Sequence, residues 1–187
     1  MEAMTVTMHS DAWLVVIDPQ RIFASPDSPW GSPMFTDILD PVRRLAAVAG
    51  DRTVVTRWVS PDPAQGSWAP YLQAWPFADV PDDDPLFDVV DELADLARTV
   101  VTATTFGKWG PTLAEVTGPT PRLVIAGVAT DCCVISTALA AADAGATVTI
   151  VSDACAGSTP ENHRSALAVM GLYPPQITIA TTAEVLA

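Results

Sequence analysis

The sequence predicts an α/β fold: a single three-layer domain over residues 1–187, with a mostly parallel six-stranded sheet and helices on both faces. Short runs of β-branched and apolar residues, without polar alternation, are typical of strands that are covered on both faces. Helical patterns lie between these runs, and strands that alternate with helices pair in parallel through right-handed crossovers. The length of 187 residues fits one domain.

Six runs are predicted to be strands. They are residues 12–17 (AWLVVI), 53–56 (TVVT), 99–102 (TVVT), 123–126 (LVIA), 147–151 (TVTIV) and 177–180 (ITIA). The predicted helices are residues 38–49, 86–96, 111–116, 131–144 and 159–170. Ser158 and Glu161 form a capping-box pattern at the start of the last helix, with Pro160 in its first turn. Two Pro-rich segments, residues 25–33 and 60–85, are predicted to be irregular, and long loops often shape a binding site.

The charge balance argues against two classes of partner. The chain has 22 acidic and 9 basic side chains, for a net charge of −13. We therefore expect no nucleic-acid partner and no anionic membrane surface, because both require a basic face. No apolar stretch reaches the ~18 residues of a membrane span. Residues 1–11 lack the basic start and apolar run of a signal peptide, so none is expected.

The cysteines favour a reducing environment. The chain has three, Cys132, Cys133 and Cys155, and two of them are adjacent. An odd count with adjacent members does not suggest a disulfide framework. We therefore expect a cytoplasmic protein.

Polar side chains that could perform chemistry follow three of the predicted strands. Asp18 ends the first strand, Lys108 follows the third, and Cys133 follows the fourth. Ligands bind beyond the carboxyl ends of parallel strands, so these side chains could converge at one edge of the sheet.

Each of these residues also has a purely structural interpretation. If Thr130 caps the following helix, Cys133 lies in the first turn, where N–H groups and the helix dipole favour a thiolate and could hold an oxyanion. A free cysteine is otherwise a small core residue, and Cys132 and Cys155 are interpreted in that way. Asp18 could be a base that takes the thiol proton or a turn former. Lys108, the only lysine, could serve the site or be a solvated loop charge.

The motifs around Asp18 and Cys133 resemble those of the isochorismatase-like cysteine hydrolases. Residues 15–23 (VVIDPQRIF) are similar to the hydrophobic-Asp-x-Gln-x-x-Phe opening of that family. Residues 127–134 (GVATDCCV) resemble its nucleophile segment, and residues 153–157 (DACAG) a common downstream stretch. The order and spacing of these motifs run over nearly the whole chain.

The resemblance implies a Rossmann-like sheet and a Cys–Asp–Lys catalytic group. Cys133 would be the nucleophile and Asp18 the general base. A cis peptide bond would join Val128 to Ala129, and the N–H groups of Ala129 and Cys133 would form the oxyanion hole.

Two features depart from the family pattern. The family's lysine usually ends the third strand, six residues before an aromatic; aligned without gaps, this chain has Ala103 at the lysine position and Trp109 at the aromatic. Either Lys108 reaches back from the loop or the catalytic lysine is missing. The nicotinamidase branch carries an Asp and two His after the second strand, where residues 56–61 read TRWVSP. We therefore expect no metal and no cofactor.

Three functions remain open. The first is metal-independent hydrolysis of a small amide through a thioester on Cys133, since isochorismatases that cleave a vinyl ether need no cysteine there. The second is vinyl-ether cleavage of the isochorismatase type, with Asp18 as the acid and Cys133 as a bystander. The third is a disarmed binding scaffold that lacks the lysine at Ala103.

Aromatic residues near the predicted site could form a substrate pocket. We expect Phe23, Trp58, Phe106 and Trp109 to line a pocket for a small-molecule substrate. The same side chains could instead pack in the core or at a subunit interface. The resemblance implies a homodimer or homotetramer.

Overall fold

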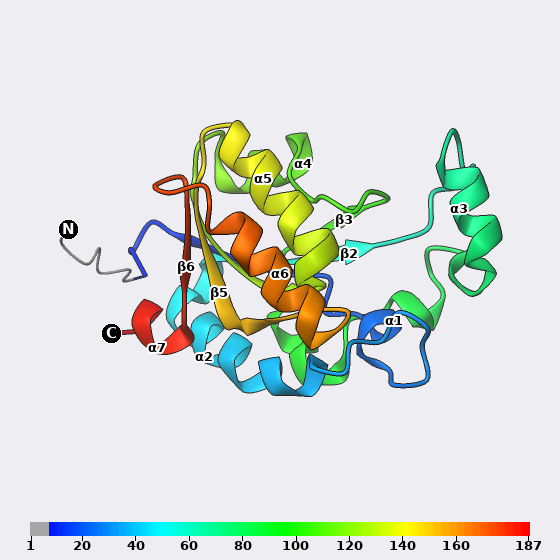
Figure 1. Ribbon diagram of the computed structural model, residues 1–187, viewed down its shortest axis with the longest axis horizontal. Coiled ribbons are helices and arrows are strands. Elements are labelled where there is room, and N and C mark those ends of the chain that lie inside the picture. The colour runs from blue at the N-terminus through cyan, green and yellow to red at the C-terminus, as the bar shows by residue number, and fades with distance from the viewer. Residues whose placement is uncertain (1–7) are drawn as a thin grey trace.

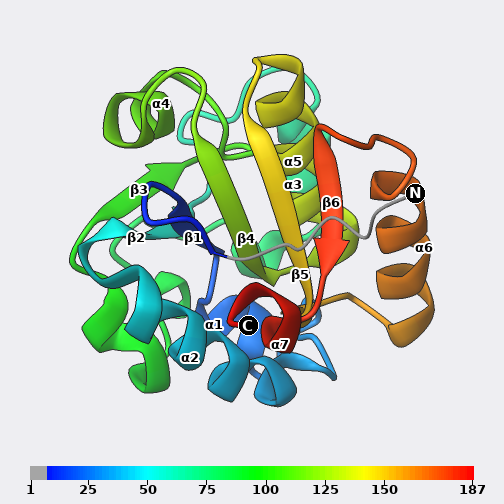
Figure 2. The ribbon, with the colours of Figure 1, turned by 90° about the vertical axis from the view of Figure 1, so that its left-hand side faces the viewer.

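The computed structural model describes residues 8–187, and its centre is a six-stranded sheet (Figure 1). Figure 2 shows the strands side by side in the order β3-β2-β1-β4-β5-β6, from left to right. The strands are β1 (Trp13–Ile17), β2 (Thr53–Trp58), β3 (Val100–Ala103), β4 (Arg122–Val128), β5 (Thr147–Ala156) and β6 (Ile177–Ala180). Every neighbouring pair is parallel. The predicted α/β class with a parallel sheet is confirmed.

Helices cover both faces of this sheet. The helices are α1 (Arg21–Ala24), α2 (Leu39–Ala49), α3 (Trp68–Ala74), α4 (Pro111–Thr117), α5 (Ile135–Asp143), α6 (Pro160–Met170) and α7 (Thr182–Val185). Alternate residues of β1 face opposite cores, as the pleat requires. Leu14 and Val16 pack in a core with α2 and α7, whereas Val15 and Ile17 pack with α4, α5 and α6. No helix among residues 8–187 has the length and apolar character needed to cross a membrane.

The helix predicted over residues 86–96 is wrong. Two 3₁₀ helices, Pro85–Phe87 and Asp91–Leu96, flank an extended stretch. In that stretch Val89 forms an antiparallel bridge with Gln20, and the Val90 N–H donates to the Pro19 carbonyl. These hydrogen bonds to the segment after β1 take the place of helical ones. Residues 88–90, which we call the strap, therefore pack across the end of β1.

Two predicted helix starts also differ. The helix after β4 begins with a π-helical turn, Thr130–Val134, whose N-cap is Ala129. Thr130 is therefore not the capping residue of this helix. Its hydroxyl is hydrogen bonded to Nδ1 of His163 instead (2.8 Å). The α6 helix is capped by Thr159, which accepts from the Asn162 N–H, while Ser158 binds Asp131 instead.

The segment 60–85 is less irregular than predicted, because it contains α3. Figure 1 shows α3 standing apart from the sheet, at the end toward which β2 points. Residues 25–33 form turns, as expected. Part of the segment considered as a signal peptide, residues 1–7, lies outside the described residues.

Candidate active site

Asp18 lies at the carboxyl end of β1, in the middle of the sheet. Its backbone has φ of 45°, a left-handed conformation that is uncommon for residues other than glycine and is often found at functional sites. The neighbouring strand holds it there. The Thr56 hydroxyl of β2 donates to Asp18 Oδ1 (2.6 Å) and accepts from the Asp18 N–H (3.1 Å). The carboxylate is completely buried, so its charge needs a partner.

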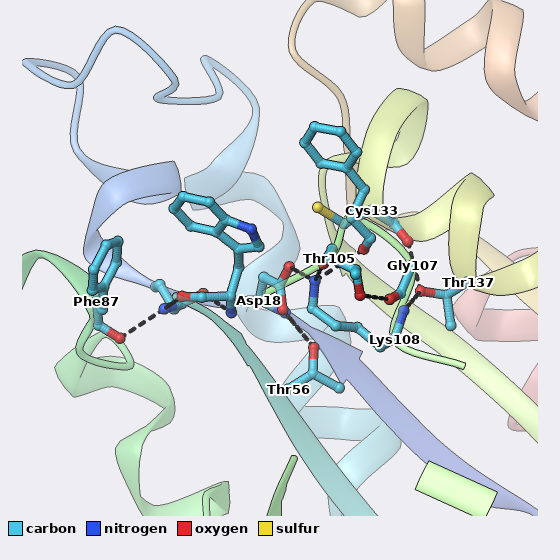
Figure 3. A network of polar contacts seen from close by, with 11 residues as sticks. Asp18, Thr56, Phe87, Thr105, Gly107, Lys108, Cys133 and Thr137 are labelled. Atoms are coloured by element: carbon cyan, nitrogen blue, oxygen red, sulfur yellow. Dashed lines mark hydrogen bonds and ion pairs between the residues drawn. The ribbon is translucent and has the colours of Figure 1, made fainter. Parts of the chain in front are cut away.

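That partner is Lys108, which reaches the site from the loop after β3. Its Nζ lies 2.8 Å from Asp18 Oδ2, and both side chains are fully buried. The ammonium also donates to the carbonyls of Thr105 (2.7 Å) and Phe106 (2.9 Å) (Figure 3). The Lys108 N–H donates to the Thr137 hydroxyl, which donates to the Cys133 carbonyl. The loop that carries the lysine is thus tied to the helix that carries the cysteine.

Gln20 fixes the ends of β1 and β2 relative to the strap. Its Nε2 donates to the carbonyls of Trp58 and Phe87, and its Oε1 accepts from the Trp58 N–H, each at 2.8 Å. Gln20 is fully buried and uses both of its amide atoms. The glutamine of the Asp-x-Gln motif therefore has a structural role, holding the backbone on which Asp18 and Trp58 lie.

Cys133 lies in the π-helical turn after β4, beside the charged pair. Figure 3 shows Cys133, Asp18 and Lys108 gathered at one place. A hydrogen bond with the Cys132 thiol, burial, and the Asp18 carboxylate together raise the pKa of the Cys133 thiol well above its usual value. A first helical turn would favour a thiolate, but with 3% of the residue exposed, desolvation favours the neutral thiol.

The backbone before Cys133 is folded tightly against β1. The peptide bond from Val128 to Ala129 is cis. Gly127 has φ of 110°, and a Cβ there would lie 2.2 Å from the Ile17 carbonyl oxygen. Only glycine fits this approach, which brings the end of β4 against the residue that precedes Asp18.

The N–H groups expected to form the oxyanion hole lie at this turn. The Ala129 N–H has no hydrogen-bond acceptor within the part of the chain that the structure describes. The Ala129 carbonyl accepts from the N–H groups of Cys132 (3.0 Å) and Val134 (3.1 Å), the residues on either side of Cys133. The turn thus leaves the Ala129 N–H as a donor without a partner in the described residues, beside the Cys133 side chain.

A cavity of about 210 Å³ opens onto Cys133 and Ala129. Five aromatic side chains line it, and none of the described residues around it is a lysine, arginine or histidine. The residues around it are Phe23, Pro29, Trp30, Gly31, Trp58, Tyr71, Phe106, Ala129, Asp131, Cys132, Cys133 and Ser158. Of the four expected pocket residues, Phe23, Trp58 and Phe106 lie here.

The fourth, Trp109, does not line this cavity. It borders a neighbouring surface hollow with Trp68 and Ser136, because the loop turns away after Lys108 is buried. Trp30 and Tyr71 also line the cavity, and only Tyr71 lies outside the aromatic residues that the sequence places near the site. Cys132 was interpreted as packing, yet it is half-buried and lines the cavity. Cys155 is buried in the core, as expected.

The donor residues needed for a metal site are missing from the described chain. Residues 8–187 contain no group of three or more His, Cys, Asp or Glu side chains placed to hold a metal ion. At the end of β2, Trp58 packs edge-to-face against Trp30 and Phe87. These residues do not fit a metal centre.

Comparisons with known proteins agree with this architecture. A cysteine hydrolase from Pseudomonas syringae pv. phaseolicola has 18% identity and a TM-score of 0.79, covering 98% of this chain and 96% of that one. A nicotinamidase from Bacillus subtilis has 20% identity and a TM-score of 0.70, covering 91% and 99%. A pyrazinamidase of Pyrococcus horikoshii in complex with zinc has 24% identity and a TM-score of 0.69, covering 91% and 99%. Among curated proteins, none matches this chain significantly.

The family model named Isochorismatase domain matches residues 12–184. This range includes Asp18, Lys108 and Cys133 together with all six strands. The chain belongs to the isochorismatase family.

Proposed function

We propose that this protein hydrolyses a small amide through a thioester on Cys133, without a metal or other cofactor. The observation that carries the proposal is the buried Asp18–Lys108 pair beside a cavity onto which Cys133 opens. Paired titratable groups beside a nucleophile in a cavity are a pattern typical of a catalytic site. The nicotinamidase and pyrazinamidase with the same fold support amides as the substrate class.

In the first half of the reaction, Asp18 takes the thiol proton as Cys133 Sγ attacks the amide carbonyl carbon. The N–H groups of Ala129 and Cys133 receive the oxyanion. Asp18 then gives the proton to the leaving nitrogen, the C–N bond breaks, and an acyl-thioester remains on Cys133.

In the second half, Asp18 takes a proton from water as the water oxygen attacks the thioester. The carboxylic acid leaves, and the proton returns to Sγ. Lys108 pairs with the Asp18 carboxylate and orients it, because its ammonium is the cation that faces Oδ2. Because the pKa of Cys133 is raised, the scheme has Asp18 remove the thiol proton as Sγ attacks, and does not start from a resting thiolate.

The vinyl-ether alternative has less support from the cavity. An isochorismate-type substrate carries carboxylates, which need cationic partners. The one charged residue on the cavity wall is Asp131, and the Lys108 ammonium is already engaged by Asp18 and two carbonyls. The disarmed alternative also loses its main argument, since Lys108 supplies an ammonium despite Ala103.

The test measures ammonia release from a panel of small carboxamides, together with the mass of the Cys133 peptide after rapid acid quench. We expect an acyl adduct on Cys133, and Cys133→Ala should lower turnover at least about 1,000-fold. Cys155→Ala is the matched control, because it removes another buried cysteine away from the cavity. Amide turnover that survives Cys133→Ala, or vinyl-ether cleavage without amide cleavage, would overturn the proposal.

A further inference from the structure

The indole N–H of Trp58 is a buried donor without an acceptor. Trp58 is 1% exposed, and its Nε1 has no hydrogen-bond partner among the residues described. The hydroxyls of Thr53 and Ser60 share this condition, but neither lines the cavity beside Cys133. Asp18 Oδ2 also has no hydrogen bond, but the Lys108 ammonium lies 2.8 Å from it as an ion-pair partner. Trp58 does line it. Its unpaired donor therefore belongs to a side chain of the candidate active site.

An unpaired indole N–H has an energetic cost that calls for an explanation. Buried tryptophans usually find a partner for this atom. A buried donor left unsatisfied loses its hydrogen bond to water without gaining another. A ligand acceptor that fills the position recovers this cost on binding, so the position favours ligands that have one.

The indole is held in place from several sides, so rotation toward another acceptor is restricted. Its backbone N–H and carbonyl are both bonded to Gln20. Its ring packs edge-to-face against Trp30 (5.5 Å between centroids) and Phe87 (5.5 Å), and tilted against Trp68 (6.3 Å). Because the ring is fixed, its N–H favours ligands whose acceptor atom lies at one particular position, and not every ligand that has an acceptor.

The charged group on the cavity wall is already used. Asp131 accepts from the N–H (2.8 Å) and hydroxyl (2.6 Å) of Ser158. The N–H groups of Ala129 and Cys133 are assigned to the oxyanion in the proposed reaction. The acceptor for Trp58 is therefore an atom other than the scissile carbonyl.

We propose that Trp58 is a specificity-determining residue whose Nε1–H donates a hydrogen bond to a second acceptor on the acyl part of the substrate. This rests on the proposed amide hydrolysis and narrows its substrate class. The favoured amides are uncharged and flat, to fit the aromatic wall, and carry a ring nitrogen or a further carbonyl oxygen. Amides of equal shape without that atom are poor substrates.

The test compares benzamide with the three pyridinecarboxamides, which differ from it by one ring nitrogen at three positions. We expect one pyridine isomer to exceed benzamide at least about tenfold in kcat/KM, as one well-placed hydrogen bond allows. Trp58→Phe should reduce this ratio to near one. A second variant carries 3-benzothienylalanine at position 58, which keeps the bicyclic shape but has sulfur in place of the N–H, and it should give the same loss.

Two further measurements separate this inference from the proposed reaction. Dissociation constants of the same four compounds are measured on Cys133→Ala protein, with and without the change at position 58. The preference for a pyridine isomer over benzamide is then obtained as a ratio of dissociation constants, without turnover. Trp75→Phe is the control, because Trp75 belongs to the same aromatic cluster but does not line the cavity. It should leave the ratio unchanged.

The outcomes are distinct. If no amide is hydrolysed but the binding ratio is present and depends on the N–H at position 58, the proposed reaction fails and the role of Trp58 stands. If benzamide binds as well as every pyridine isomer, or if the benzothienyl variant keeps the wild-type ratio, the role of Trp58 is overturned.

Discussion

Two parts of the candidate site differ in how their polar atoms are satisfied. One is the buried group of Asp18, Thr56 and Lys108, which we call the floor, and the other is the aromatic wall of the cavity. On the floor, Asp18 Oδ1 is bonded to Thr56, Oδ2 faces Lys108, and the ammonium also meets two backbone carbonyls. On the wall, Trp58 Nε1 has no acceptor among residues 8–187. On the floor, Oδ2 makes no hydrogen bond but is paired with the charge of the ammonium, whereas on the wall Trp58 Nε1 has neither kind of partner.

This difference separates two tasks. A floor whose polar atoms are already paired does not need to reorganise when charge develops, which is the usual source of electrostatic catalysis. A wall with an unmet donor discriminates between ligands. Changes on the floor should therefore alter stability and kcat, and changes on the wall should alter KM and substrate choice.

The largest expected effect comes from Lys108→Met, which leaves the Asp18 carboxylate buried without its cation. Removing one partner of a buried ion pair lowers the free energy of unfolding by about 3–5 kcal/mol. Urea denaturation measures this loss, and ammonia release should fall at least about 100-fold. The double variant Asp18→Asn, Lys108→Met should recover much of the stability and none of the activity. An unchanged free energy of unfolding in the single variant would contradict an Asp18–Lys108 ion pair that is shielded from water.

A smaller effect is expected from Trp30→Leu on the wall. Trp30 stacks on Phe23 and packs edge-to-face against Trp58 and Phe77, so it holds the wall together. Losing this surface weakens ground-state and transition-state binding alike, so KM should rise about tenfold while kcat changes little. Steady-state kinetics on the best amide decide this. A loss confined to kcat would place Trp30 in the chemistry instead.

The two adjacent cysteines should differ in the pH dependence of their alkylation. The raised pKa of Cys133 keeps it neutral near pH 7, so its thiolate fraction grows about tenfold per pH unit through the range above its ordinary value near 9. The hydrogen bond from Cys133 lowers the pKa of Cys132, which is also more exposed. Iodoacetamide labelling followed by mass spectrometry should therefore detect Cys132 first. A Cys133 rate that levels off below pH ~8 would count against the neutral thiol.

The smallest expected effect is that of Ala103→Lys. A lysine at this half-buried position of β3 adds a cation where Lys108 already contacts Asp18, so activity should change less than about threefold. The same substitution in the Lys108→Met background should restore part of the lost activity. Failure to restore any would show that the path of the loop, and not only its charge, is required.

The sequence predicted the sheet and the places of Asp18 and Cys133 well, because β-branched runs mark buried strands and both residues follow such runs directly. It left Lys108 undecided, because the turn that buries this lysine depends on Thr137, a partner 29 residues away. The helix expected over residues 86–96 fails for a similar reason, since its backbone bonds go to the segment after β1. Tyr71 gave no signal, because it comes from α3 within a Pro-rich segment.

The position of β1 at the middle of the sheet has a consequence for synthesis of the protein. β1 emerges first from the ribosome, but its neighbour β4 follows about a hundred residues later, as their pairing of Val15 with Ile125 implies. Until then, one edge and part of both faces of this apolar strand lack their final cover, and long-range pairing of this kind is slow and prone to aggregation. The nascent chain should therefore depend on chaperones until residues 122–134 have left the exit tunnel, and Cys133 emerges directly after the strand that pairs with this edge of β1.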